Sequence, residues 1–149
     1  MIYAQHFTQE EFRDWSDDMS PRLITMLDVL RFRLGSVIEI SGSDYALGRN
    51  LGLGKMSEHN VDEWGEVLAV DCFIGGVYSR AQAEAVALEA KAIGFTGIGV
   101  YSDTRNNQGE EQVMFHFGVR PNKMMGRPAK WGRVDGKRTS LMAAIQSLK

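Results

Sequence analysis

Cysteine, proline and long apolar stretches are scarce in this chain. Of its 149 residues, 1 is cysteine and 3 are proline. The single cysteine, Cys72, excludes an internal disulfide framework and agrees with synthesis in a reducing compartment. No stretch approaches the roughly 18 consecutive apolar residues of a membrane-spanning helix, so we expect no insertion into a membrane.

The N-terminus and the net charge argue against further classes of protein. The opening residues, MIYAQHFTQEEF, contain neither a basic segment nor an apolar one, so they do not resemble a secretory signal peptide. We therefore expect synthesis in the cytoplasm. A formal net charge of -2 argues against general nucleic-acid binding, and we expect no nucleic-acid partner.

One basic segment departs from this charge balance. Between Val119 and Arg138 seven residues are lysine or arginine, and Asp135 is the single acidic residue. Such a segment can contact an anionic polymer, but a solvated basic loop produces the same pattern. We expect the loop.

The remaining composition is typical of a soluble globular domain. Hydrophobic residues make up 44% of the chain and charged residues 24%. A chain of this length buries roughly 70% of its unfolded surface, which is enough for a core without disulfides or other staples. We expect a single domain over residues 1–149, and the composition leaves its oligomeric state open.

The periodicity of apolar residues and the positions of capping residues predict helices and strands of the α+β class. Helices are predicted over 8–15, 20–35, 79–94 and 140–149, and strands over 36–41, 66–73, 97–101 and 113–119. The last two strands are predicted to form a hairpin, and the glycine-rich segment 42–54 a long loop. Helices beside neighbouring antiparallel strands favour a small antiparallel sheet with flanking helices.

An aspartate within an apolar strand is the first candidate for chemistry. Burying the carboxylate of Asp71 costs several kcal/mol unless a counter-charge or a metal compensates it. Strand alternation places Asp71 on the face opposite Cys72, and it places His116 on the face opposite Phe115 and Phe117. If these two strands are neighbours, Asp71 and His116 share a face, with their Cβ atoms roughly 5 Å apart.

A second histidine completes a possible set of metal ligands. His59 lies in the loop before the Asp71 strand. Because zinc–nitrogen and zinc–oxygen bonds are about 2.0–2.2 Å long, Asp71 and His116 can reach one ion, and His59 can join them. Two histidines and an aspartate, with the fourth position left to water, are typical of catalytic rather than structural zinc. His6 stands beside Phe7 ahead of the first helix, and we interpret it as structural.

Three segments of the chain resemble the motifs of one enzyme family. SEHNVDEWGEVLAVDCF, GFTGIGVYSDT and MFHFGVRP are similar to the Ser-x-His, Ala-x-Asp, Gly-x-Gly-x-Tyr and final His series of the zinc D-alanyl-D-alanine carboxypeptidases, the LAS-type peptidoglycan peptidases of bacteria and phage endolysins. The resemblance runs from about Phe7 to Trp131. It implies a D-Ala-D-Ala carboxypeptidase/hedgehog-like fold and a Zn2+ ion held by His59, Asp71 and His116.

This resemblance also implies an activity. The chain would be a zinc-dependent metallopeptidase, a hydrolase that cleaves the stem or cross-link peptides of peptidoglycan as a carboxypeptidase or an endopeptidase. It would be of phage or bacterial origin and would degrade the cell wall after release from the cell or as a component of the virion. Zinc in such a site lowers the pKa of its bound water toward ~7 and polarises the scissile carbonyl.

The chain departs from the family pattern in its ligand spacing and in its substrate-binding arginine. His59 and Asp71 are further apart than in the family, with NVDEW inserted between them, which a loop can absorb at little cost. The family's Ser-Gly-Tyr-Arg motif is replaced here by SGSDYALGRN. We therefore expect Arg49, or else Arg120, to hold a substrate carboxylate, since guanidinium suits bidentate capture.

A third departure concerns the general base. Relatives carry a carboxylate or histidine close before the last zinc histidine, and phage relatives often have an aspartate two residues after it. This chain has Val113 and Met114 before His116, and Gly118 after it. We expect Glu111, in the loop before the His116 strand, to be the catalytic base. Other candidates from the sequence are Glu110, Asp103 and Glu66.

Other interpretations are open at the level of sequence. Without an efficient base, the chain would be a phage structural or cell-wall-binding module that keeps the zinc fold but lacks efficient catalysis. In a third interpretation the domain binds no metal, and Asp71 is paired with an arginine. A nucleophilic role for Cys72 is disfavoured, because strand alternation points its thiol toward the apolar face, where a thiolate is costly.

Overall fold

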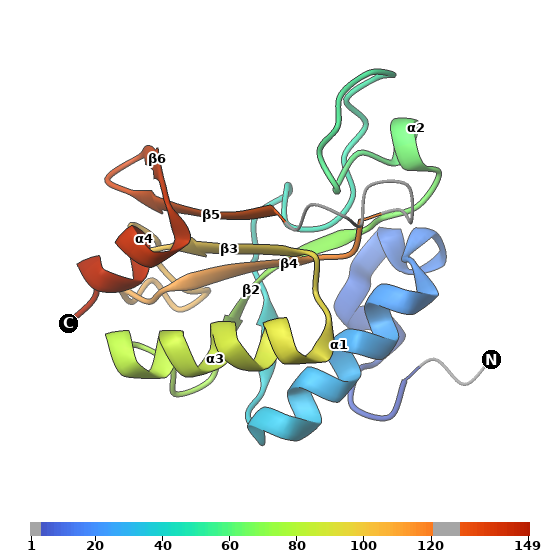
Figure 1. Cartoon of the computed structure of the whole chain (residues 1–149). Coiled ribbons are helices and arrows are strands. Elements are labelled where there is room, and N and C mark those ends of the chain that lie inside the picture. Colours follow the sequence, from blue (N-terminus) through green and yellow to red (C-terminus); the bar gives the residue numbers. More distant parts are fainter. Residues whose placement is uncertain (1–3, 121–128) are drawn as a thin grey trace.

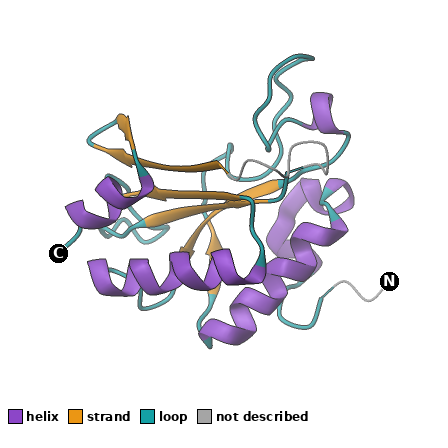
Figure 2. Cartoon of the chain, in the orientation of Figure 1, coloured by secondary structure: helices purple, strands orange, loops and turns teal. Residues whose placement is uncertain are grey.

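The computed structural model describes residues 4–120 and 129–149. The elements are η1 (Gln9–Asp18), α1 (Pro21–Leu34), β1 (Ile38–Ile40), α2 (Val61–Trp64), β2 (Ala69–Ile74), α3 (Arg80–Ile93), β3 (Gly97–Tyr101), β4 (Met114–Gly118), β5 (Ala129–Val134), β6 (Lys137–Thr139) and α4 (Leu141–Ser147). The architecture is α+β, with one mixed sheet and flanking helices (Figure 2). In the part of the chain described, no helix combines the length and the apolar character that crossing a membrane requires.

The sheet has six strands in the order β1-β2-β4-β3-β5-β6. The predicted hairpin is confirmed, because β3 and β4 pair in antiparallel orientation. The expectation of a purely antiparallel sheet is wrong at one position, since β5 lies on the far side of β3 and runs parallel to it (Figure 1). Strands β3 and β5 therefore share one direction, which is opposite to that of β4.

The expectation that the basic segment is a solvated loop is wrong in part. Residues 129–134 and 137–139 form β5 and β6, which pair in antiparallel orientation at the edge of the sheet. An edge position lets lysine and arginine side chains reach solvent while the backbone pairs, and for this reason charge alone did not indicate strands. Lys123 and Arg127 lie outside the described residues.

Most helix ends lie where the capping residues predict them. The Ser20 side chain accepts a hydrogen bond from Leu23 N–H at the start of α1, and Gly35 ends that helix with φ of 62°. Ser79 caps α3 together with Gln82. The first predicted helix is instead the 3₁₀ segment η1, interrupted at Arg13, whose φ is 53°.

Helices α1 and α3 lie on one side of the sheet (Figure 1). The core contains Val70 and Cys72 from β2 and Phe115 and Phe117 from β4. Asp71 and His116 alternate with these residues and therefore point to the other side of the sheet. On that side run the loop between β1 and β2 and its short helix α2.

We predict that the contact between β5 and α4 depends on Gly132. A Cβ atom at this position would overlap with the side chain of Ala144 and the carbonyl oxygen of Ser140. Gly132→Ala should lower the free energy of unfolding by about 1–3 kcal/mol, because rigid neighbours must move apart. Urea denaturation provides the measurement. Gly75→Ala is the matched control, since a Cβ there meets Val37 at 3.7 Å or more; equal losses in the two variants would contradict this packing.

Candidate metal centre

The site is built on one row of residues that crosses four strands. Asp71 of β2 lies directly opposite His116 of β4, His116 opposite Gly99 of β3, and Gly99 opposite Trp131 of β5. The prediction that Asp71 and His116 share a face is therefore confirmed, and they are direct partners in the ladder. Gly99 leaves room for the Trp131 ring, whose centroid lies 4.5 Å from that of His116.

Backbone hydrogen bonds hold His59 above this row. Leu68 N–H donates to the carbonyl oxygen of Glu58 at 2.9 Å, and Arg49 N–H donates to that of His59 at 2.8 Å. Asp71 N–H donates to the carbonyl of Ala46 at 2.9 Å. The segment around His59 is thereby attached both to the start of β2 and to the preceding loop.

Three ligand atoms form a nearly equilateral triangle. His116 Nδ1 lies 3.1 Å from Asp71 Oδ1, and His59 Nε2 lies 3.3 Å from His116 Nδ1 and 3.4 Å from Asp71 Oδ1. Zinc bonds of about 2.0–2.1 Å in tetrahedral geometry place neighbouring ligand atoms about 3.3–3.4 Å apart. The buried residues His59, Asp71 and His116 therefore lie close enough together to bind a metal ion.

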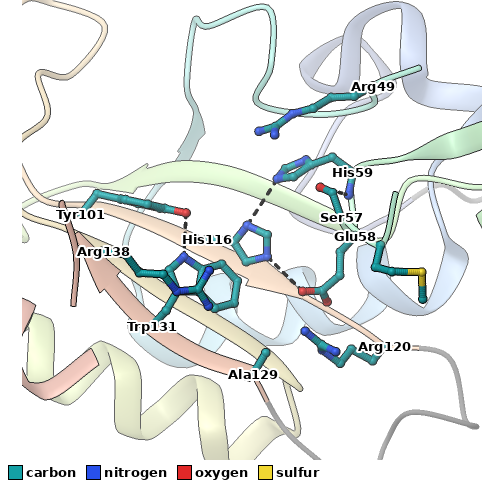
Figure 3. Close-up of a pocket in the computed structure, with 11 residues that line it drawn as sticks. Arg49, Ser57, Glu58, His59, Tyr101, His116, Arg120, Ala129, Trp131 and Arg138 are labelled. Carbon is teal, nitrogen blue, oxygen red and sulfur yellow. Dashed lines mark hydrogen bonds and ion pairs between the residues drawn. The ribbon is translucent and has the colours of Figure 1, made fainter. Parts of the chain in front are cut away.

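Each of the three residues also has an outer partner. His59 Nδ1 bonds to the carbonyl oxygen of Leu47 at 2.5 Å, so this nitrogen is the donor and Nε2 keeps its lone pair. His116 Nε2 lies 3.3 Å from Glu58 Oε1 (Figure 3). Arg49 lies 3.4 Å from Asp71 Oδ2. Outer partners of this kind orient ligands and select histidine tautomers in metal sites.

The protonation of the metal-free site follows from its carboxylates. Burial opposes the charged form of Asp71, but the hydrogen bond from His116 and the positive charge of that ring hold the pKa of this carboxyl well below its usual range. Burial alone would lower the pKa of His116, but hydrogen bonds and charges of Asp71 and Glu58 raise it to about 9. Burial lowers the pKa of His59 despite Asp71. Without metal, one imidazolium is thus held between two carboxylates.

A cavity of about 270 Å³ opens beside the triangle. Its lining consists of Arg49, Met56, Ser57, Glu58, His59, Tyr101, His116, Arg120, Ala129, Trp131 and Arg138 (Figure 3). Trp131 Nε1 donates a hydrogen bond to the Tyr101 hydroxyl oxygen at 2.9 Å. Burial and the charge of Asp71 raise the pKa of Tyr101 above its ordinary value.

The structure brings together five of the six site residues expected from the sequence. Arg49 and Arg120 line the same cavity as His59 and His116, and Asp71 lies against both histidines. Glu111 is outside this group. Its side chain is 85% exposed and lies 3.5 Å from Arg105, in the loop before β4.

The other carboxylates considered as the base also lie elsewhere. Asp103 pairs with Arg133, with 2.8 Å between Oδ1 and Nη2. Glu110 is exposed and Glu66 is half-buried, and neither is part of the cavity lining that the described residues form.

Sequence reasoning missed Glu58. This residue is only 5% exposed, although its neighbours in the sequence, SEHN, read as a polar loop. Two glycines on the facing strands, Gly97 and Gly118, provide space for its carboxylate. Glycine inside a strand often marks the close approach of another group. These two glycines were therefore the feature of the sequence that could have indicated a side chain packed against the sheet.

Comparison with known proteins finds no matching family model, curated protein or solved structure. The function proposed below therefore rests on the geometry of the site and on the motifs of the sequence.

We predict that the metal-free protein becomes less stable as pH rises from about 6.5 to 9. The folded state raises the pKa of His116 from 6.5 to about 9, so its stabilising contribution is complete below pH 6.5 and is lost as pH passes through 9. Urea denaturation in the presence of a chelator, at several pH values, measures this loss. His116→Gln removes the titrating group and should flatten the dependence; the same slope in both proteins would contradict the assignment.

Proposed function

We propose that this chain is a zinc-dependent peptidase that acts on the stem or cross-link peptides of peptidoglycan and has a D-Ala-D-Ala carboxypeptidase/hedgehog-like fold. The observation that carries the proposal is the triangle of His59 Nε2, Asp71 Oδ1 and His116 Nδ1 beside an open cavity. The order of the motifs around these residues is similar to that of this family and supports the same proposal.

The chemistry of the three donors favours zinc. Two imidazole nitrogens and one carboxylate oxygen suit this borderline-soft ion, and three protein ligands leave a position for water or substrate. When bound, Zn2+ supplies an activated water and polarises a carbonyl oxygen. Asp71 supplies one negative charge to the ion, while both histidines bind in the neutral form.

We infer that Tyr101 stabilises negative charge on the substrate. Its hydroxyl oxygen accepts the hydrogen bond from Trp131, so its own proton remains available to another acceptor. The hydroxyl lines the cavity in which a scissile carbonyl would approach the metal ligands. A donor aimed at the developing oxyanion strengthens binding in the transition state more than in the ground state.

Three arginines make the cavity attractive to an anionic peptide. Arg49, Arg120 and Arg138 line it. Nε of Arg120 is buried, and it has no hydrogen-bond partner among the residues that the structure describes. A buried donor of this kind favours a ligand with an acceptor group, and guanidinium matches a carboxylate well. Stem peptides carry such carboxylates, and binding of one by Arg49 or Arg120 remains our expectation.

One observation favours the alternative function, a phage structural or wall-binding module without efficient catalysis. Glu111 is exposed beside Arg105. Of the described residues that line the cavity, only Glu58 is a carboxylate, and it contacts the edge of His116 that faces away from the triangle. Neither carboxylate is therefore in place to take a proton from a metal-bound water, a step that typically contributes 10²–10⁴ in rate.

We predict about one zinc ion per chain, because the three ligands form one mononuclear site. Elemental analysis after purification without chelator tests this. His116→Ala should lose most of the metal, because it removes one of three protein ligands. His6→Ala should keep it, since His6 stacks on Phe32 at 5.9 Å between centroids, away from the site. Equal losses would contradict the ligand assignment.

We predict that the zinc-loaded protein releases new amino groups from peptidoglycan or D-alanine from a stem pentapeptide. His59→Ala should reduce either rate at least 10²-fold, since the activated water is lost with the metal. Amine labelling and amino-acid analysis provide the two measurements.

The alternative function gives a different result in the same assays. A wall-binding module would sediment with cell wall, bind zinc, and release nothing. That combination would contradict the peptidase and support the module, whereas release of product that survives removal of zinc would contradict both.

A further inference from the structure

The carboxylate of Glu58 is buried beside the candidate metal centre. One of its oxygens, Oε1, lies 3.3 Å from His116 Nε2, and the other, Oε2, is buried without a hydrogen-bond partner among the described residues. A buried carboxylate is costly unless a donor or a positive charge compensates it. His116 is the partner that the structure supplies.

The surface of the sheet is hollowed beneath this carboxylate. Gly97 and Gly118 are directly paired between β3 and β4, and a Cβ atom on either would overlap with Glu58. Ala69 and Ala129 extend the same row on β2 and β5. Four small residues in one row across four strands thus leave room for the side chain, so Glu58 occupies a site shaped to receive it.

The imidazole of His116 lies between two different environments. Its Nδ1 faces Asp71 and His59, at 3.1 and 3.3 Å, while its Nε2 faces Glu58. Both nitrogens therefore face a carboxylate oxygen. When a metal ion takes the lone pair of Nδ1, the one proton of the neutral ring lies on Nε2, and Glu58 is the acceptor for it. The Leu47 carbonyl selects the opposite tautomer of His59 in the same manner.

We propose that Glu58 is a positioning residue that holds His116 in the tautomer and orientation required to bind zinc through Nδ1. This inference rests on the metal site of the proposed function and adds a second carboxylate to it. Glu58 accepts the Nε2 proton of His116, and its negative charge makes the imidazole a stronger ligand. The residue does not touch the metal, since it meets the opposite edge of the ring.

Zinc affinity of Glu58 variants tests this role. Competition with a chromophoric chelator should give a dissociation constant that is about tenfold higher for Glu58→Gln, which keeps an acceptor but loses the charge. Glu58→Leu, which removes both, should raise it further, within a range of about 10–100-fold. Glu63→Gln is the matched control, because Glu63 lies in α2 and bonds to Gly54 N–H at 2.8 Å; its affinity should equal that of the parent.

A spectroscopic measurement separates positioning from general stability. In nitrogen-correlated NMR spectra of the zinc-loaded parent, the His116 ring proton should be found on Nε2 and should be protected from solvent exchange. In Glu58→Leu this protection should be lost. Gly118→Ala provides an independent variant, since it displaces the carboxylate without removing it and should weaken zinc binding in the same direction.

Several results would overturn the inference. Parental zinc affinity in both folded Glu58 variants would do so, and so would a His116 proton located on Nδ1; either result leaves the metal site itself intact. A parent protein that cannot be loaded with zinc would instead overturn the proposed function, and the inference with it. If Glu58→Leu does not fold, the zinc affinity of Glu58→Gln and the position of the His116 ring proton in the zinc-loaded parent decide between the two outcomes.

Discussion

The buried carboxylate of Asp71 is the constraint on which the site depends. A charge removed from water must be compensated nearby, and the pairing of β2 with β4 places His116 directly opposite it. His59 and Arg49 approach the same carboxylate from the loop between β1 and β2. Arg49 contacts one oxygen of Asp71 and the two histidines contact the other, so an arginine supplies only part of the surroundings of this carboxylate.

Small residues on the sheet determine which side chains can approach this centre. Gly99 admits the ring of Trp131 over His116, and Gly97 with Gly118 admits the carboxylate of Glu58. Glycine weakens a strand, so its use here indicates that close approach is needed at these positions. The Gly-x-Gly-x-Tyr segment is therefore explained by packing: the two glycines make space, and Tyr101 presents its hydroxyl to the cavity.

The distinction between a peptidase and a binding module concerns proton transfer rather than metal binding. The His59, Asp71 and His116 triangle, the arginines and Tyr101 are compatible with both functions. A bound ion, guanidinium groups and a hydroxyl would contact a peptide whether or not it is then cleaved. A hydrolase also needs an acceptor for the proton of the attacking water. Glu111 is exposed and Glu58 is held against His116, so neither of these carboxylates is positioned for that role.

Short-range patterns in the sequence determined the helix caps at Ser20 and Ser79, the hairpin of β3 and β4, and the face of its own strand on which Asp71 and His116 each lie, because strand alternation and capping act over a few residues. Only the tertiary structure decided that β2 and β4 are neighbours, that β5 lies parallel to β3, that Glu58 is buried against the sheet beside His116, and that Glu111 stays at the surface. These features depend on which strands become neighbours and on the space between them. The contact between Glu58 and His116 arises from packing of the loop against the sheet, and no local pattern encodes it.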